Sequence, residues 1–225
     1  MVERVLVFDM DGVLLDVTGS YRATIVATVE HFTGRRIDND VIQSYKNRGG
    51  FNDDWVLSRQ ACEDLGVTVT LDRVTEVFNE FFLGVDGREG LIRREKWIAR
   101  PGLLEDLASR YKFAIFTGRY DFEIAPTLDR FARHLTFDPI VRQGMGFAPK
   151  PAPDGLLHIA SLYPGAALTY LGDTVDDALS AKAAGIRFIA VVSPEVPRYD
   201  EVRALHREHG AAAVIDDINH LENVL

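Results

Sequence analysis

Residues 5–12, VLVFDMDG, decide the fold of this 225-residue chain. The first four are apolar and rich in branched side chains, and the last four form a turn-type cluster with two carboxylates. A short apolar run that stops at such a cluster is typical of a strand buried on both faces of a sheet. We therefore expect a buried strand at 5–8 whose carboxyl end carries Asp9 and Asp11.

Four later apolar runs repeat this design, at residues 113–116, 167–171, 188–192 and 213–215. Segments with helical periodicity lie between the strands, at 103–110, 122–133, 155–162 and 176–184. Strands that alternate with helices favour a parallel sheet covered on both faces. The predicted fold class is therefore α/β, a Rossmann-like parallel sheet with helices on both faces.

Residues 17–95 interrupt this alternation, because no convincing buried strand appears among them. Amphipathic helical patterns occur there instead, at 21–32, 53–65 and 71–82. The glycine-rich stretch 84–94 has the composition of a linker that returns the chain to the sheet. We interpret 17–95 as an inserted helical domain, and residues 1–16 and 96–225 as the Rossmann-like core.

Composition and charge exclude several classes of protein. The hydrophobic fraction of 47% is that of a globular chain, and the single cysteine, Cys62, excludes a disulfide scaffold and a cysteine-rich zinc module. A net charge of -9 repels polyanions, so we expect no nucleic-acid partner. No apolar stretch approaches the roughly 20 residues that span a bilayer, and the first residues do not resemble a signal peptide. We expect a cytoplasmic protein without a membrane partner.

Polar groups follow three of the predicted strands, and ligands bind beyond the carboxyl ends of strands in such sheets. Asp9 and Asp11 are two apart, and two nearby carboxylates can take different roles when their surroundings separate their pKa values. The alternative is a turn in which they bond main-chain amides. Thr117 and Gly118 supply donors suited to phosphate oxygens.

A lysine and a second group of acids complete the polar set. Lys150 lies between two prolines, which stiffen its loop and fix the direction of its ammonium group. The alternative is an exposed lysine in a proline-rich loop. Residues 172–177, GDTVDD, place three acids at a strand end and a helix start, where they can ligate Mg²⁺ or cap the helix. His206 and His209 share one helix face, which we expect to be solvent-exposed rather than a metal site.

Together these signals resemble the four motifs of the haloacid dehalogenase superfamily of phosphotransferases. The motifs are residues 9–13 after the first strand, Thr117, Lys150 and residues 172–177. Order, spacing and strand context agree over nearly the whole chain. The helical insertion is similar to the superfamily's first type of cap domain, as in phosphoglycolate phosphatase-like members, and the resemblance gives it the task of substrate specificity.

The resemblance implies a role for each matched position. Asp9 would be the nucleophile that forms an aspartyl-phosphate, and Asp11 would protonate the leaving alkoxide and then activate water. Lys150 would offset negative charge, and Thr117 would hold phosphate oxygens. Substrate-binding positions beside them would be Met10, Gly118 and Arg119. Ligands of a Mg²⁺ cofactor would be Asp9, Asp11 through its main-chain carbonyl, Asp173 and, through water, Asp177.

Asp11 also indicates the reaction. Members that displace halide typically lack an acid at this position, because halide leaves without a proton whereas an alkoxide does not. We therefore expect a Mg²⁺-dependent phosphatase that acts on a small phosphorylated metabolite, as a monomer or homodimer. The alternatives are a sugar-phosphate mutase with the same nucleophile and a non-catalytic binding protein of the same fold.

The inserted domain offers candidates for contacts with the leaving group. Residues 45–55, YKNRGGFNDDW, occur where related caps carry a specificity loop. Lys46, Arg48 and Asn52 are the candidates for binding an anionic or polyol group. The alternative is a solvated loop between two helices, in which Asn52 or Asp53 caps a helix.

Overall fold

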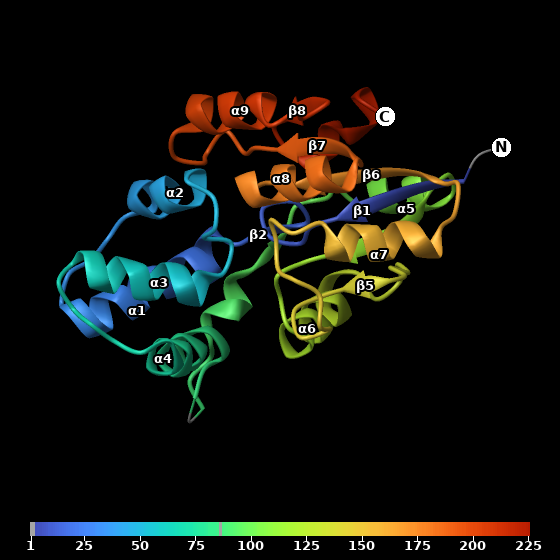
Figure 1. The fold of residues 1–225 in the computed structure, drawn as a ribbon. Helices are drawn as coiled ribbons and strands as arrows, with labels where there is room; N and C mark the ends of the chain where they lie inside the picture. Colours follow the sequence, from blue (N-terminus) through green and yellow to red (C-terminus); the bar gives the residue numbers. More distant parts are fainter. Residues whose placement is uncertain (1–2, 86) are drawn as a thin grey trace. The chain divides into compact units, whose positions relative to one another are not determined.

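The computed structural model describes residues 3–85 and 87–225 (Figure 1). The predictions for residues 1–2 of the core and for one position of the linker 84–94, Asp86, therefore lie outside the described residues. The chain divides into two compact units, which are described separately below. The core unit comprises Met1–Leu15 and Trp97–Leu225, and the inserted unit comprises Asp16–Lys96.

The core unit is built on a parallel sheet with β1, Arg4–Phe8, near its middle. Within the described residues the sheet has six strands, in the order β5-β4-β1-β6-β7-β8. The other strands are β4 (Lys112–Phe116), β5 (Ile140–Val141), β6 (Ala167–Gly172), β7 (Arg187–Val191) and β8 (Ala213–Ile215). The predicted parallel α/β fold is confirmed, and the two-residue strand β5 is an element that the sequence pattern did not indicate.

The strand order reverses direction after β5, and this reversal distributes the helices over both faces. Right-handed crossovers place the helices before β5 on one face and the later ones on the other. The earlier helices are α5 (Leu103–Ala108) and α6 (Asp121–Phe131). The later helices are α7 (Asp154–Leu162), α8 (Val175–Ala184) and α9 (Tyr199–Glu208). The short helix η3 (Ile218–Asn223) follows β8 and bonds the segment before α5, where Asn219 Oδ1 accepts from the Arg100 amide at 2.7 Å. In Figure 1, α7 and α8 lie side by side.

Burial of β1 on both faces explains its uninterrupted apolar sequence. Val5, Leu6, Val7 and Phe8 are all fully buried. Val5 and Val7 pack in the cluster that includes residues of α7 and α8. The rings of Phe8 and Phe113 are nearly perpendicular, with their centroids 5.2 Å apart. Each such side chain contributes roughly 1.5–3 kcal/mol when it is fully buried.

The register of the sheet aligns the carboxyl ends of its central strands. Phe8 is level with Ile115 of β4 and with Leu171 of β6. The residues that follow these three strands therefore emerge at one edge of the sheet. This edge carries the candidate site.

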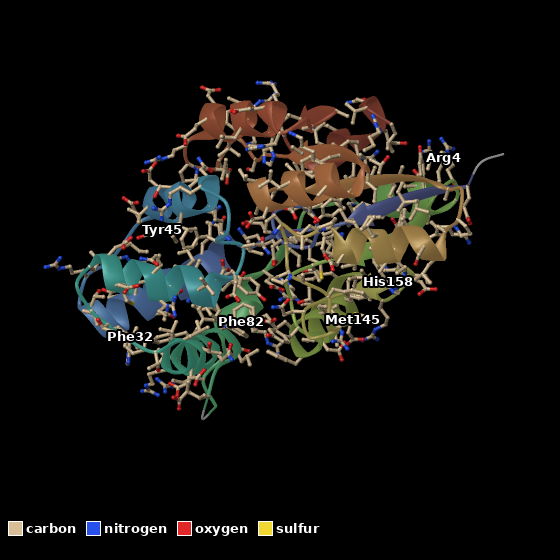
Figure 2. All side chains as sticks on the ribbon, viewed as in Figure 1. Arg4, Phe32, Tyr45, Phe82, Met145 and His158 are labelled. Carbon is tan, nitrogen blue, oxygen red and sulfur yellow. The ribbon has the colours of Figure 1, made fainter. Side chains whose placement is uncertain are left out.

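The inserted unit is helical, as predicted. Its helices are α1 (Ala23–Thr33), α2 (Asn39–Asn47), α3 (Asp54–Asp64) and α4 (Leu71–Leu83), with the short helices η1 (Thr18–Arg22) and η2 (Leu91–Arg94). Its apolar core includes Ile25, Ile42, Tyr45 and Phe82, the last two of which are labelled in Figure 2. The chain enters this unit through β2 (Leu15–Asp16) and leaves it through β3 (Lys96–Trp97), and these two strands pair with each other.

None of the helices in residues 3–85 and 87–225 combines the length and the apolar character that a membrane crossing requires.

Candidate active site

Asp9 follows the last residue of β1 and continues alongside the neighbouring strand. Its main-chain N–H donates to the carbonyl oxygen of Leu171, at 2.8 Å, so the backbone of Asp9 is held level with the end of β6. Its side chain is 6% exposed. The carboxylate is therefore fixed in a nearly closed environment at the sheet edge.

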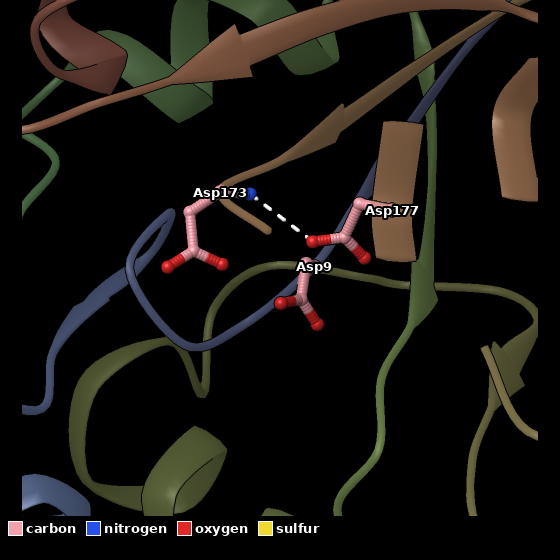
Figure 3. Close-up of side chains that lie close together, drawn as sticks. All are labelled: Asp9, Asp173 and Asp177. Atoms are coloured by element: carbon pink, nitrogen blue, oxygen red, sulfur yellow. Dashed lines mark hydrogen bonds between the residues drawn. The ribbon is translucent and has the colours of Figure 1, made fainter. Parts of the chain in front are cut away.

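Three carboxylates gather at this edge, from residues far apart in the chain (Figure 3). Asp9, Asp173 and Asp177 each offer an oxygen, and the three oxygens lie within 4.8 Å of one another. Asp9 and Asp177 are buried, and Asp173 is partly exposed. Hard oxygen ligands with one partly open side are the donor set that Mg²⁺ takes in proteins, so the residues fit that ion.

Two glycines allow these carboxylates to approach the backbone. A Cβ atom on Gly12 would lie 2.2 Å from Asp173 Oδ2, and the positive φ of 71° at Gly12 also favours glycine. A Cβ on Gly172 would lie 2.5 Å from Asp177 Cβ. The glycines of the first and fourth motifs thus leave the space that the acids fill.

Lys150 places a buried cation between two of the carboxylates. Its Nζ lies 3.0 Å from Asp9 Oδ1 and 2.7 Å from Asp177 Oδ1, and its side chain is 2% exposed. The ammonium also lies 4.9 Å from the centre of the Phe116 ring and 5.5 Å from that of Tyr170. Burial disfavours the charged form, but the carboxylates of Asp177 and Asp9 hold the pKa of Lys150 above its usual value.

The pKa of Asp9 is raised mainly by burial rather than by neighbouring charges. Burial raises its pKa to about 7, and the negative charges of Asp177 and Asp11 add to this effect, whereas Lys150 opposes it. A second positive charge beside Asp9 would favour the ionised carboxylate. A metal cation bound beside Asp9 would therefore keep its carboxylate ionised.

Asp177 is the best-bonded acid of the group. Its Oδ1 accepts from the Tyr170 hydroxyl at 2.6 Å. Its Oδ2 accepts from the Thr174 amide at 2.9 Å, the Thr174 hydroxyl at 2.7 Å and the Asp173 amide at 3.2 Å. Although burial alone would raise the pKa of Asp177, Lys150 and these donors hold it below the usual value. With Lys150 included, five donors surround its two oxygens, so Asp177 orients the ammonium and the Asp173 loop.

Asp11 lies on the other side of the turn and is paired with an arginine. Arg119 donates to Asp11 Oδ1 from Nη2 at 2.5 Å and from Nε at 3.0 Å. The arginine side chain is 1% exposed and that of Asp11 is 30% exposed. Arg119 was predicted to bind substrate, whereas its guanidinium is directed at Asp11.

The remaining predicted positions of the core lie at the same edge. Thr117 is buried and follows β4, and Gly118 beside it is exposed. The Thr117 hydroxyl accepts from the Arg119 amide at 3.2 Å. Met10 is fully buried, and its carbonyl oxygen accepts from the amides of Leu14 and Leu15, at 2.9 and 3.0 Å. The roles of these residues in binding stay predictions.

Two of the three predicted residues in the inserted unit have partners within that unit. Lys46 Nζ lies 2.9 Å from Asp54 Oδ1, with both side chains less than 15% exposed. The guanidinium of Arg48 lies over the rings of Tyr45 and Phe51, at 4.5 and 5.1 Å. Asn52 is half-buried, and Asp53 is the residue that caps α3.

Two residues near the site were missed or misjudged from the sequence. In the sequence, Tyr170 is part of the apolar run 167–171, but its hydroxyl donates a hydrogen bond to Asp177. The expectation that His206 faces solvent is wrong: it is fully buried, and its Nε2 lies 3.0 Å from the carbonyl oxygen of Asp173. Burial lowers the pKa of His206. An apolar face of α9 continuing through position 206 is the signal that could have indicated this burial.

The sequence matches the haloacid dehalogenase-like hydrolase family over residues 3–185. The chain therefore belongs to the haloacid dehalogenase-like hydrolases, as the resemblance of its motifs predicted. A haloacid dehalogenase-like protein from Agrobacterium tumefaciens has the same fold, with a TM-score of 0.74, 21% identity and coverage of 99% of this chain and 97% of that one.

Relatives of known name include a phosphatase. The phosphoglycolate phosphatase 1 of Pseudomonas aeruginosa is 25% identical over 97% of this chain and 78% of its own length. The imidazoleglycerol-phosphate dehydratase of Phytophthora nicotianae is 32% identical over 85% of this chain. The aligned region is 44% of that protein, so the chain spans less than half the length of this relative.

Proposed function

We propose that the protein is a Mg²⁺-dependent phosphomonoesterase that acts on a small phosphorylated metabolite through a phosphorylated Asp9. The observation that carries this proposal is the buried carboxylate of Asp9, 3.0 Å from Lys150 and grouped with Asp173 at the edge of the sheet. Phosphoryl transfer depends on positioning and on neutralised charge. The fixed carboxylate of Asp9 as nucleophile and the buried ammonium of Lys150 beside it would meet both needs.

The proposed first step is attack by an Asp9 oxygen on phosphorus. The bond from Asp9 to phosphorus forms while the ester bond breaks, and Asp11 gives a proton to the departing alkoxide oxygen. At about 4 Å, the repulsion between the carboxylate and one phosphate charge is about 4 kcal/mol at an effective dielectric constant of 20. Lys150 offsets part of this repulsion.

The proposed second step is hydrolysis of the phosphorylated Asp9. Asp11 removes a proton from water as the water oxygen attacks phosphorus and the bond to Asp9 breaks. The proton gained here is the one donated in the next cycle, so the net reaction is an ester plus water giving an alcohol and phosphate. Thr117 and the Gly118 amide would hold the phosphate oxygens in both steps.

Asp9, Asp173 and the main-chain carbonyl of Asp11 would hold the Mg²⁺ ion. When bound, the ion supplies positive charge beside the nucleophile and the phosphoryl oxygens. Asp177 would support the ion through water, because direct ligation would cost the bonds that its oxygens already accept.

The names of the relatives guide the choice of substrates. A phosphoglycolate phosphatase and an imidazoleglycerol-phosphate dehydratase suggest 2-phosphoglycolate and imidazole glycerol phosphate as members of a test panel. Glucose 1-phosphate tests the alternative of a sugar-phosphate mutase, which would yield an isomer without free phosphate. A non-catalytic protein would turn over no member of the panel.

The experiment is phosphate release by the purified chain across this panel, with Mg²⁺ and with EDTA. We expect Mg²⁺-dependent release that Asp9→Asn lowers by more than about 1,000-fold, because the nucleophile is removed. Asp121→Asn is the matched control, since Asp121 is exposed and starts α6 in the same unit. Isomerisation without release would favour the mutase, and turnover that survives Asp9→Asn would refute the proposed nucleophile.

A further inference from the structure

The contact between Arg119 and Asp11 is uneven over the two carboxylate oxygens. Oδ1 accepts from both Nη2, at 2.5 Å, and Nε, at 3.0 Å. Oδ2 accepts from Nε over a longer distance, 3.3 Å. The guanidinium thus occupies one oxygen and leaves the other for a different partner.

The arginine is itself held firmly. Its Nη1 donates to the Thr127 hydroxyl at 3.2 Å, and that hydroxyl donates to the carbonyl oxygen of Glu123 at 3.1 Å. The main-chain oxygen of Arg119 accepts from the amide of Gln143 at 3.0 Å. Only 1% of the Arg119 side chain is exposed, so the guanidinium has little access to a substrate. Its hydrogen bonds keep it directed at Asp11.

We propose that Arg119 is the positioning residue for Asp11, and that it reserves Asp11 Oδ2 for proton transfer in the two steps described above. This inference rests on the proposed function. An arginine fork fixes a carboxylate in direction as well as in charge. Without it, the partly exposed Asp11 side chain could rotate away from the leaving group.

The geometry suits both protonation states of Asp11. When Oδ2 carries the proton that the alkoxide will take, Oδ1 is the carbonyl oxygen and still accepts from Arg119. When the proton has left, the carboxylate retains the same two bonds at Oδ1, and Oδ2 is ready to accept a proton from water. Neither step requires the pair to break.

The test compares two esters that differ in whether the leaving group needs a proton. A residue that positions the acid should matter for one ester only, whereas a structural ion pair should matter for both. p-Nitrophenyl phosphate has a leaving group that departs without a proton, whereas the alkoxide of glycerol 2-phosphate needs one. Release of each leaving group in a single turnover is measured for the wild type, Arg119→Met, Arg119→Lys and Arg142→Met. Arg142 is the matched control, because it is a partly exposed arginine that pairs with the exposed Asp121.

We expect Arg119→Met to slow release of the alkoxide by about 10- to 100-fold and release of nitrophenolate by less than about threefold. Arg119→Lys should recover part of the alkoxide rate. The change should appear in the maximal rate of the single turnover rather than in the concentration that gives half of that rate. Equal losses on both esters, or no loss on either, would overturn the inference. Failure of the wild type to cleave any ester would instead overturn the proposed function.

A second measurement needs neither turnover nor a stable Arg119→Met variant. In the ¹⁵N-labelled, metal-free protein, the Nε–H signal of Arg119 is identified by its loss in Arg119→Lys. We expect slow exchange of this proton with water and a shift of its signal in Asp11→Asn. An Nε–H that exchanges as fast as those of exposed arginines, with no response to Asp11→Asn, would contradict the fixed pair.

Discussion

Lys150 and Asp177 form a buried ion pair, with Nζ 2.7 Å from Oδ1 and neither side chain more than 2% exposed. Breaking a buried pair by removal of one partner leaves an uncompensated charge, which is far more costly than the loss of a surface pair. The pair is therefore as much a part of the folded core as of the candidate site.

Lys150→Met is expected to damage both stability and turnover. Two buried carboxylates would lose their cation, so the free energy of unfolding should fall by ~3–5 kcal/mol. Turnover of the best substrate should fall by about 100- to 1,000-fold, the size seen when one charge-stabilising donor is lost. Urea unfolding and phosphate release measure the two effects. Lys182→Met, at an exposed position of α8, should change neither, and an equally stable Lys150→Met would contradict the importance of the pair.

The raised pKa of Asp9 predicts how stability depends on pH. In the metal-free protein the folded state keeps the proton of Asp9 up to about pH 7, whereas the unfolded state releases it near 3.8, the ordinary pKa of an aspartate. The stability contributed by protonated Asp9 is therefore lost as the pH rises through about 7. Between pH 5.5 and 8, the wild type should lose on the order of 2 kcal/mol relative to Asp9→Asn.

Urea unfolding of both proteins at the two pH values, with and without Mg²⁺, makes this measurement. Because Mg²⁺ competes with the proton on Asp9, it should stabilise the wild type more at pH 8 than at pH 5.5. Parallel pH profiles for the wild type and Asp9→Asn would show that the surroundings of Asp9 do not disfavour its charge.

Gly12→Ala is expected to weaken metal binding. The new Cβ would lie 2.2 Å from Asp173 Oδ2, and alanine is strained at the φ of 71°. Gly185→Ala is the matched control: its φ is 68°, but no atom lies within 4 Å of the added Cβ. Both variants should lose about 1–2 kcal/mol of stability from the backbone. Calorimetry should find a loss of Mg²⁺ affinity of more than about tenfold for Gly12→Ala alone; equal affinities would show that the approach of Asp173 to Gly12 is not required.

The inserted unit allows a test of substrate specificity. On the prediction that Arg48 contacts an anionic leaving group, Arg48→Ala should raise KM for 2-phosphoglycolate by about tenfold, equivalent to ~1.4 kcal/mol, and leave kcat unchanged. The matched change Lys46→Met removes the ion pair with Asp54 and should instead lower the stability of the unit. A KM that does not respond to Arg48→Ala would refute this contact and leave the stacking on Tyr45 and Phe51 as a structural role for Arg48.

The sequence was sufficient to predict the parallel sheet and the edge at which the site assembles. Buried parallel strands are continuous apolar runs, and strand ends meet at one edge by topology, so Asp9 and Asp173 could be brought together without coordinates. β5 escaped prediction because two residues are too few to show a period.

Contacts between side chains of different elements could not be predicted in the same way. The pairing of Arg119 with Asp11 depends on a side-chain direction set by Thr127 of α6. The burial of His206 depends on how α9 packs beside the Asp173 loop, since a histidine is equally at home on a surface. Tyr170 belongs to an apolar run in the sequence, and its bond to Asp177 follows from the way β6 and α8 pack together.

The pairing of β2 with β3 means that the chain departs for the helical insertion and comes back at neighbouring positions. A segment whose two ends are adjacent imposes no separation on the rest of the polypeptide, so its length and composition can change without moving the strands that flank it. Recombination could therefore exchange this module for another of unrelated shape while the sheet edge with its acidic cluster is inherited intact.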